Sequence, residues 1–572
     1  MLILGIFAYQ HDASACLIKD GKILGFVEEE RLNREKHSAL FPKNSIEYLF
    51  KTYNFKFEDI DYITFCWDVK KEFFSNLKSF IFNIPQSLNL LKSGAAQNDL
   101  SLLSRLKKQF FLKNEFLING FSLSKKTKIV EIEHHLGHAA SVFLVSEFDE
   151  SAIITWDGRG EKTSILISHG KSNKIEKIKE IQIPNSLGIF YSAITKYVGF
   201  NLFDEGKTMG LSAYGNDIYL NDFNDIIFKK GETFELNQKY FSFMTHGRNK
   251  YLSELFYKKF GPPRDKSAKI SQHYKDIAFA AQKKLEEIGI HIVKETKKII
   301  KSENLCITGG VALNCIMNQK IIESKIFKNV FVQPIASDSG TSIGGPLYLY
   351  NSIMNYKRDY VFKDIYLGPD FKNEEIEKII LKNKINYYKS KDIFKETAKL
   401  ISNGEIIGWF QDKMESGPRA LGNRSILADP RNPNIKDKIN SIIKKRESYR
   451  PFAPAVLHEY RNNFFDMSAD SDYMILSANV LEHQKLKIPS VTHVDGTARV
   501  QTVKKDMNFK FWSLINEFYQ ISGVPILLNT SFNENEPIVC NPQEAIDCFT
   551  RTDMNYLILD NFILTKKTNG NF

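Results

Sequence analysis

The segment NLCITGGVALNC, residues 304–315, combines three features of an α/β fold in twelve letters. Its apolar first half is typical of a buried strand, and Gly309 and Gly310 form a turn before a helix begins. A later segment, NVFVQPIASDSGTSIGG (329–345), repeats this order of strand, small-residue loop and helix. Successive strand–turn–helix units predict a sheet covered by helices.

Two earlier segments also begin with strands. Residues 2–38 predict three strands joined by tight turns, followed by a charged stretch, and SAIITWDGRGEKTSILIS (151–168) places an Asp-Gly turn between alternating apolar runs. Two strand-first halves of this kind predict a two-lobed α/β domain with a cleft between the lobes. Residues 70–128 have helical spacing of apolar residues and predict a helical insertion. We expect the insertion to pack onto the main domain, the alternative being a membrane-surface role.

The chain of 572 residues is too long for one hydrophobic core. The sequence changes character around 352–375, and a dense cluster of Arg, Lys and Pro follows at 412–455. We therefore place a domain boundary between residues 355 and 356, with one domain over 1–355 and a second over 356–572.

Composition excludes several classes of protein. Apolar residues make up 43% and charged residues 25%, as in a globular protein. His11 and Asp12 interrupt the apolar start, and no run of eighteen apolar residues occurs, so we predict no signal peptide and no membrane span. The six cysteines contain no CxxC pair, which favours a reduced, cytoplasmic protein.

The chain is basic, with 78 − 67 = +11 net charges. A basic surface of lysines is one explanation, and a polyanionic partner is another. Because the lysines are spread widely and no arginine-rich block contains interleaved aromatics, we favour small phosphorylated ligands over nucleic acid.

Two histidines four residues apart, His134 and His138, lie where an apparent strand becomes a helix in VEIEHHLGHAASVFLVSEF (130–148). Side chains at i and i+4 share one face of a helix and can reach one ion. Ordinary core histidines would give the same spacing. Asp157 and Asp338, each just after a predicted strand, would complete a set of nitrogen and oxygen ligands suited to iron(II), manganese or zinc rather than calcium.

Several loops are candidates for binding anions. GGVALN (309–314) would offer backbone amides at a helix start, and Lys207 in DEGKTMGLSAYG (204–215) could meet a phosphate. A common α/β turn and a solvated lysine are the alternatives. A second group lies in Gly/Pro-bounded loops and strands of the C-terminal part: Arg419, Arg424, Arg431, Lys444, Arg446, Arg450, Arg499, Asn529 and Ser531. We favour an anion site there over loop-fixing salt bridges, because arginine matches phosphate geometry.

His11 and Asp12 follow the first predicted strand in YQHDAS. A His–Asp pair of this kind can orient or deprotonate a hydroxyl group. A capped turn with a buried histidine is the alternative.

Eleven motifs occur in one order along the chain: HDASACLI, EEERLNREKHS, HHLGHAAS, DGRGE, KTMGLSAYG, GGVALNC, DSGTSIGG, SGPRALGNRSILADPR, KRESYRPFAPAVL, HVDGTARVQTV and LNTSFNENEPIVCNPQEAI. With them the sequence resembles the nodulation/cephamycin-type O-carbamoyltransferases, the family that includes tobramycin carbamoyltransferase. The likeness runs from residue 3 to about residue 550. Only segment 70–128 has no clear match, and acceptor choice is expected to lie there.

The resemblance implies an actin-like (ASKHA) N-terminal domain and a YrdC-like α/β C-terminal domain. It also implies a reaction: carbamoyl phosphate and Mg-ATP form carbamoyl adenylate in the second domain. The first domain then transfers the carbamoyl group to a hydroxyl of a sugar-containing small molecule or glycan. Two polyanionic donors would explain clustered arginines.

The resemblance also assigns residues. It implies iron(II), held by His134, His138, Asp157 and Asp338, and nucleotide-holding loops around Lys207, Gly309, Gly310 and Asn314. It implies a carbamoyl phosphate and ATP site of Arg419, Arg424, Lys444, Arg446, Arg450, Arg499, Asn529 and Ser531. His11 would act on the acceptor hydroxyl with Asp12, and Lys36 and Glu29 would lie nearby.

Two other functions share parts of this pattern. A tRNA threonylcarbamoyladenosine-type enzyme would use both folds, although SGPRALGNRSI and RESYRPFAPAV favour the small-molecule family. An actin-like ATP-binding scaffold would bind ATP without chemistry. A homodimer is plausible for a chain of this size.

Overall fold

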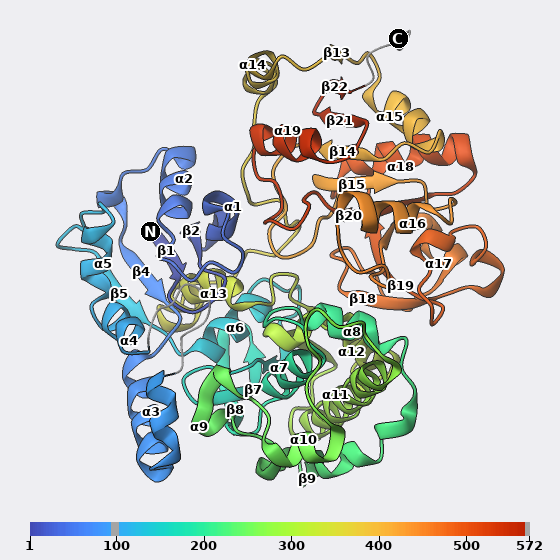
Figure 1. Cartoon of the computed structure of the whole chain (residues 1–572). Helices are drawn as coiled ribbons and strands as arrows, with labels where there is room; N and C mark the ends of the chain where they lie inside the picture. Colours follow the sequence, from blue (N-terminus) through green and yellow to red (C-terminus); the bar gives the residue numbers. More distant parts are fainter. Residues whose placement is uncertain (93–101, 567–572) are drawn as a thin grey trace. The chain divides into compact units, whose positions relative to one another are not determined.

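The computed structural model describes residues 1–92 and 102–566 (Figure 1). Their contacts divide the chain into two compact units, Met1–Phe362 and Lys363–Phe572, a division seven residues beyond the expected boundary at 355. Both units are built on β-sheets with covering helices, so the predicted α/β class is confirmed. Each unit is described by itself below.

The first unit begins with a five-stranded sheet of order β3-β2-β1-β4-β5. Its first three strands form an antiparallel meander, and β4 and β5 run parallel to β1. The strands are β1 (Leu2–Phe7), β2 (Ser14–Lys19), β3 (Lys22–Glu28), β4 (Tyr62–Phe65) and β5 (Lys128–Glu131). All six residues of β1 are buried, because this central strand is covered on both faces.

A second sheet in the same unit repeats this topology with order β8-β7-β6-β11-β12. Again three antiparallel strands come first and two parallel strands follow. They are β6 (Glu150–Trp156), β7 (Thr163–Lys171), β8 (Lys174–Gln182), β11 (Asn304–Thr308) and β12 (Asn329–Val332). This duplicated order is the topology of the actin-like domain that the sequence predicted.

Two helices join the sheets at the centre of the unit. α6 (His134–Phe143) packs against β6 and β11, α13 (Thr341–Leu347) packs against β1 and β2, and the two helices pack against each other (Figure 1). A Cβ atom on Gly344 would lie 1.8 Å from the carbonyl oxygen of Gly137, so the crossing requires a glycine. It brings the start of α6 close to the loop that precedes α13.

Between β4 and β5 the described chain is helical, with α3 (Val69–Phe82), a 3₁₀ segment (Gln86–Lys92), α4 (Leu102–Phe110) and α5 (Leu112–Ile118). Leu106, Leu112 and Phe116 belong to the core under the first sheet. On α3, by contrast, Phe74 and Phe82 are exposed. Residues 93–101 of the predicted insertion lie outside the described residues.

The remaining elements of the first unit surround the second sheet or cap the first. The helices are α1 (Glu29–Asn33), α2 (Lys43–Tyr53), α7 (Leu187–Tyr197), α8 (Glu205–Ser212), α9 (Phe243–His246), α10 (Glu254–Phe260), α11 (Gln272–Ile299) and α12 (Cys315–Glu323), with a small hairpin of β9 (Ile227–Lys230) and β10 (Thr233–Leu236). In the described ranges, no helix has both the length and the apolar character needed to cross a membrane.

The second unit contains a ten-stranded mixed sheet of order β13-β22-β21-β14-β15-β20-β16-β19-β18-β17. The strands are β13 (Tyr387–Lys389), β14 (Ile407–Phe410), β15 (Arg424–Ala428), β16 (Ala453–Leu457), β17 (Phe465–Asp466), β18 (Leu476–Val480), β19 (Thr497–Val503), β20 (Ile526–Ser531), β21 (Tyr556–Leu559) and β22 (Phe562–Thr565). Among the described strands of this sheet, β14–β21 and β16–β19 are the parallel pairs.

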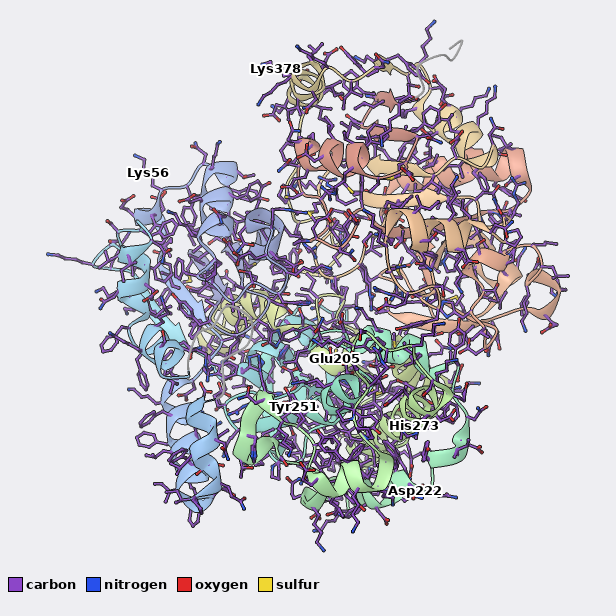
Figure 2. The ribbon with its side chains drawn as sticks, in the orientation of Figure 1. Lys56, Glu205, Asp222, Tyr251, His273 and Lys378 are labelled. Carbon is purple, nitrogen blue, oxygen red and sulfur yellow. The ribbon has the colours of Figure 1, made fainter. Side chains whose placement is uncertain are left out.

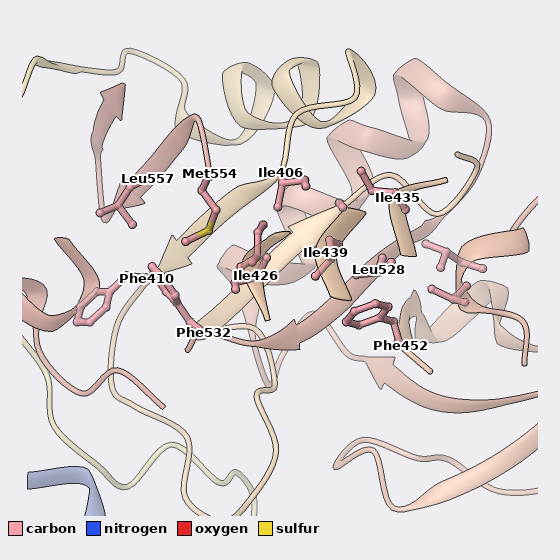
Figure 3. Close-up of a cluster of buried hydrophobic side chains, with 14 of the residues drawn as sticks. Ile406, Phe410, Ile426, Ile435, Ile439, Phe452, Leu528, Phe532, Met554 and Leu557 are labelled. Atoms are coloured by element: carbon pink, nitrogen blue, oxygen red, sulfur yellow. The ribbon is translucent and has the colours of Figure 1, made fainter. Parts of the chain in front are cut away.

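Helices cover both faces of this sheet. Ile526 and Leu528 join a core with α14 (Asn373–Asn383), α16 (Ile435–Lys438) and α19 (Pro542–Arg551), part of which Figure 3 shows. Leu527, between them, joins the opposite core with α15 (Ile393–Ser402) and α18 (Phe509–Ser522). The alternation follows from the two-residue period of a strand. A short helix, α17 (Arg461–Phe464), precedes β17.

Candidate metal centre and anion sites

Two histidines and two aspartates meet at the centre of the first unit. Nε2 of His134 lies 3.1 Å from Nε2 of His138, 3.2 Å from Oδ2 of Asp157 and 3.4 Å from Oδ1 of Asp338. His138 Nε2 lies 3.5 Å and 3.6 Å from the same two oxygens. All four residues are buried. The structure therefore brings together the four ligands that the sequence suggested.

The four candidate ligands come from three elements of the first unit. The histidines lie one turn apart on α6, Asp157 follows β6 directly, and Asp338 lies in the turn before α13. His135, between them, points elsewhere: its ring nitrogens contact the Thr155 hydroxyl and the Thr163 carbonyl. Burial lowers the pKa of His135 to about 3, so it is a neutral core histidine.

Surrounding groups orient the cluster. His134 Nδ1 lies 3.3 Å from the Cys66 carbonyl oxygen, which can only accept, so the proton is on Nδ1 and Nε2 faces the cluster. Asp157 Oδ1 accepts from the backbone N–H groups of Gly158 and Gly310, which leaves Oδ2 for the cluster. Asp338 Oδ1 is buried and has no hydrogen-bond partner within the described residues.

These distances fit a metal ion. Four ligand atoms about 2.1 Å from one ion lie about 3.4 Å from one another in a tetrahedral arrangement. The distances from the two histidine Nε2 atoms to each other and to the aspartate oxygens are 3.1–3.6 Å. A buried carboxylate oxygen without a partner is costly unless a cation or donor meets it. The electrostatics agree: although burial opposes both shifts, the carboxylates raise the pKa of His134, and the histidines lower that of Asp157. An ion of the iron, manganese or zinc type suits this donor set.

His11 lies beside this cluster. Its Nε2 is 3.4 Å from Oδ2 of Asp338 and its Nδ1 is 3.2 Å from Asp12, whose other oxygen is 2.7 Å from Nδ1 of His37. Asp12, Glu30 and His37 also form a second group with metal-ligand geometry, which is partly exposed. Burial would lower the pKa of His11, but Asp338 and Asp12 outweigh it and raise the pKa to about 9. His11 is thus placed between the metal cluster and a His–carboxylate network.

The backbone around His11 is strained. Tyr9, Asp12, His37 and Phe203 all have positive φ angles, at 67°, 58°, 53° and 70°. Left-handed backbone costs a residue other than glycine about 1 kcal/mol or more. The Phe203 ring contacts both histidines, with centroids 4.6 Å from His11 and 4.7 Å from His37. Strain concentrated around one group of polar side chains is typical of a functional site.

Lys36 and Glu29 flank this group in the sequence. Lys36 is exposed, and its neighbour His37 makes the contact with Asp12. Glu29 accepts hydrogen bonds from the backbone and side chains of Asn44 and Ser45, so it fixes the start of α2. The roles expected for Lys36 and Glu29 stay predictions, and the structure adds His37 and Glu30 as residues grouped with Asp12.

The glycine-rich turn after β11 lies against the metal cluster. Gly309 has a φ of 91°, and a Cβ atom there would lie 2.3 Å from the Trp156 carbonyl oxygen, so the position requires glycine. The side chain of Asn314 caps α12 by accepting from Met317 N–H and donates to Gln282. The predicted nucleotide loop therefore supports Asp157 on one side and a buried amide network on the other.

Lys207 lies on α8, 3.1 Å from Asp204. Its neighbour Glu205, labelled in Figure 2, is partly buried and accepts from Ser192, and burial raises its pKa. Met209 of α8 contacts Cys315, the residue after Asn314. The two loops predicted to hold a nucleotide are thus neighbours.

In the second unit, three arginines gather. The pKa of Arg446 falls because of its burial and the charges of Arg450 and Arg499. Its Nε donates to the side-chain oxygen of Asn440. Lys444 is buried beside them, and its ammonium donates to the Asn533 carbonyl and side chain and to the loop at Ser531. Burial lowers the pKa of Lys444 as well. Mutually repelling cations of this kind favour an anion between them.

Asn529 contacts the loop that carries Arg419. Asn529, on β20, donates to Gln501 and to the carbonyl of Ala420, the residue after Arg419. Asn529 Oδ1 is buried and has no partner among the residues described. Gln501 is two residues from Arg499 on β19 and shares its face.

Arg424 is a correction to the predicted anion site. Its side chain is fully buried, and its guanidinium group lies over the Phe410 ring, 3.6 Å from the ring centroid. Both Nη atoms donate to backbone carbonyls, among them those of Gln411 and Pro369. Arg431 is paired with Asp429 through its Nε and Nη2 atoms. Both arginines fix loops, the alternative that the sequence had left open.

Comparisons with known proteins identify the family of this chain. A profile of the carbamoyltransferase N-terminus matches residues 2–347, and one of the carbamoyltransferase C-terminus matches residues 398–566. The chain belongs to the carbamoyltransferase family. It is therefore an enzyme of the transferase class, as the sequence motifs indicated.

Several relatives match this carbamoyltransferase over most of its length. Nodulation protein NolNO of Sinorhizobium fredii is 36% identical over 98% of this chain and 80% of its own length. Nodulation protein NolO of Bradyrhizobium diazoefficiens is 37% identical, over 76% of this chain and 79% of its own. An uncharacterised protein of Synechocystis is 38% identical over 99% of this chain and 96% of its own.

Solved structures resemble the carbamoyltransferase only weakly. Component A of (R)-2-hydroxyglutaryl-CoA dehydratase from Acidaminococcus fermentans is 13% identical, with a TM-score of 0.32 over 61% of this chain and 98% of its own. HypF in its phosphate- and nucleotide-bound form is 13% identical, with a TM-score of 0.31 over 62% of this chain and 56% of its own.

Sequence reasoning missed some polar residues of the carbamoyltransferase. Glu30 and His37 stood in a quoted motif, EEERLNREKHS, and their proximity to Asp12 was the missing information. Glu415 holds the SGPRALGNRS loop by accepting from three backbone N–H groups, including that of Arg424. No spacing rule would have selected it, because its partners are main-chain atoms.

Proposed function

We propose that this protein is an ATP-dependent O-carbamoyltransferase that makes carbamoyl adenylate and transfers its carbamoyl group to a hydroxyl of a sugar-containing small molecule or glycan. The family match over both units supports carbamoyl transfer. The observation that carries the rest is His11, 3.4 Å from a buried ligand set and held by Asp12.

The activation half is assigned to the second unit, which we propose to be YrdC-like. Water cleaves carbamoyl phosphate to carbamate and phosphate, and a carbamate oxygen then attacks the α-phosphorus of Mg-ATP and displaces pyrophosphate. Both donors are polyanions. Arg446, whose pKa is lowered by its burial and by the charges of Arg450 and Arg499, would neutralise the charge on these phosphates together with those two arginines.

The transfer half is assigned to the first unit. The acceptor oxygen attacks the carbamoyl carbon, the bond from that carbon to the AMP oxygen breaks, and AMP leaves. In this arrangement His11 orients the attacking hydroxyl, and Asp12 and His37 hold His11 in place. The hydroxyl proton would pass to neutral His11. Asp338 and Asp12 both raise the pKa of His11, so neutralising the charge of Asp338 would lower that pKa and favour the neutral form.

The metal would be held by His134, His138, Asp157 and Asp338, with iron(II) expected. When bound, it would supply positive charge that polarises the phosphate of the adenylate. The glycine turn at Gly309 and Gly310 and the neighbouring α8 would hold the nucleotide beside it.

Pyrophosphate and AMP release test the proposal. Purified protein would receive Mg-ATP with and without carbamoyl phosphate, together with aminoglycosides, nucleotide sugars and glycans, and products would be analysed by mass spectrometry. We expect pyrophosphate release only with carbamoyl phosphate, and a carbamoylated acceptor with matching AMP release. ATP binding without carbamoyl-phosphate dependence would instead indicate a scaffold, and carbamoyl-type transfer only to tRNA would indicate the tRNA-modification alternative.

A further inference from the structure

Three arginines outside the sites assigned above lie together in the first unit. Arg105 comes from α4, Arg159 from the loop after Asp157, and Arg248 from the 3₁₀ turn after α9. Hydrogen bonds connect the first two through α3: Arg105 donates to Glu72 (2.6 Å), Asn76 donates to Glu72 (3.2 Å), and Arg159 donates to Asn76 (2.9 Å).

Arg248 reaches the same region from another segment. The α9 helix packs against the 3₁₀ segment Gln86–Lys92 of the insertion, and the side chains of His246 and Asn89 are 3.3 Å apart. The charges agree with this placement. Burial lowers the pKa of Arg248, and the positive charge of Arg105 lowers it further.

The arginines have unmet hydrogen-bonding capacity. Nη1 of Arg105 and Nη1 of Arg248 are both buried and have no partner within the described parts of the chain. Glu72 is the carboxylate that directly pairs with Arg105, and it also accepts from Trp67. Arg159 is exposed, which gives solvent a route to the group. Buried Nη donors without a partner, on arginines whose positive charges repel, are expected to bind an anion.

The group adjoins the metal cluster. Trp67, which donates to Glu72, contacts His134 with the two rings tilted and their centroids 4.9 Å apart. The loop of Arg159 continues to Glu161, which accepts from the backbone N–H of His134 at 2.9 Å. An anion held by the three arginines would therefore lie next to the candidate metal ligands, on the side of His134.

We propose that Arg105, Arg159 and Arg248 bind an anionic group, a carboxylate or a phosphate, on the acceptor. The inference rests on the proposed transfer reaction and narrows the acceptor to anionic molecules. Two of the three arginines come from the helical insertion and from the segment between β10 and α10, not from the glycine turn or α8 that are proposed to hold the nucleotide. The geometry thus separates this anion from the phosphate of the adenylate.

Inorganic phosphate is the first probe. The full chain with Arg450→Gln, which weakens the proposed activation site, would be titrated with phosphate by calorimetry, alone and with Arg248→Gln added. We expect Arg248→Gln to weaken the remaining phosphate binding by about tenfold or more, the loss of one charge-assisted contact. Lys250→Gln is the matched control, since Lys250 pairs with Glu254 on the same segment. Equal affinity with and without Arg248, or no phosphate binding at all, would overturn the inference.

AMP and paired acceptors then separate the sources of the anion. Arg248→Gln should leave AMP affinity unchanged, and a parallel loss of AMP binding would assign the arginines to the adenylate and overturn the acceptor site. In turnover, glucuronate and glucose 1-phosphate should compete with an identified acceptor better than methyl glucoside does, in wild type and in Lys250→Gln but not in Arg248→Gln. Carbamoyl-phosphate-dependent pyrophosphate release is measured alongside: its absence refutes the proposed function, and its presence without anion preference refutes only this inference.

Discussion

His138 contributes one ligand atom and little else to the first unit. Its Nε2 lies 3.5 Å from Asp157 and 3.6 Å from Asp338, and its Nδ1 has no partner within the described residues. We predict that His138→Ala lowers carbamoyl transfer by about 100-fold or more, because losing a direct ligand costs at least as much as losing an outer contact. Carbamoyl-phosphate-dependent pyrophosphate release should remain. His169→Ala is the control, since His169 pairs with Glu150 away from the cluster. Equal loss of both activities would contradict the two-site assignment.

Arg424 and Arg450 should respond in opposite ways to substitution. Arg424→Ala removes donors from buried carbonyls, including those of Gln411 and Pro369, and should lower the free energy of unfolding by about 3 kcal/mol. Arg450→Ala should leave the unfolding midpoint nearly unchanged and abolish carbamoyl-phosphate-dependent pyrophosphate release. Denaturant unfolding and the release assay, run on both variants, check this. An Arg424→Ala protein of normal stability that has lost only activity would return Arg424 to the anion site.

The sequence predicted the grouping of some single residues but not the role of others. The i, i+4 spacing selected His134 and His138 and, with two post-strand aspartates, the whole ligand set, because helix geometry fixes which side chains share a face. The same reasoning grouped Arg424 with Arg450, although one is buried among carbonyls and the other belongs to a charged cluster. Residue type alone does not distinguish an arginine that fixes a loop from one that binds an anion.

The crossing of α6 and α13 is the element on which the metal site depends. α6 carries both histidines, and α13 begins three residues after Asp338. Because a Cβ atom at position 344 would lie 1.8 Å from the Gly137 carbonyl oxygen, we predict that Gly344→Ala lowers the free energy of unfolding by about 3 kcal/mol and weakens metal binding.

Thermal unfolding and metal analysis of the purified variants test this crossing. Gly206→Ala is the matched control: it lies inside α8, and nothing is within 4 Å of its Cβ position, so helix propensity predicts equal or higher stability. If Gly344→Ala melts and binds metal like wild type, the helices are able to separate without disturbing the site, and the crossing does not position the ligands.

For helices and strands, the sequence predicted the type of each element better than the elements that it packs against. The strand–turn–helix pattern at 304–315 corresponds to β11, a 3₁₀ turn and α12. The pattern did not show that Gly310 would donate to Asp157, 153 positions away, because that contact follows from β11 lying beside β6. Parallel strand pairing joins segments that are distant in the sequence, so the local spacing of apolar residues cannot predict which strands pair.

The two candidate sites belong to different units of the chain. The ligand set and His11 belong to Met1–Phe362, and Arg446, Arg450 and Arg499 belong to Lys363–Phe572. Repetition of the strand order in the first unit could be expected from the two strand-first halves of the sequence. The arginine group at Arg105, Arg159 and Arg248 could not, because Arg105 lies in the segment without a matching motif.

Metal removal tests this division in the intact protein. After treatment with a chelator and dialysis into Mg²⁺-containing buffer, we predict loss of carbamoyl transfer and AMP release coupled to the acceptor. Carbamoyl-phosphate-dependent pyrophosphate release should persist, because the arginines of the second unit need only Mg-ATP and carbamoyl phosphate. Iron(II), manganese or zinc should restore transfer, and calcium should not, since two imidazoles favour transition metals. Bound metal would be counted by mass spectrometry, with His138→Ala as the protein that cannot be reloaded. If pyrophosphate release disappears with the metal and returns with it, the ligand set takes part in activation, and the two reactions are not separate.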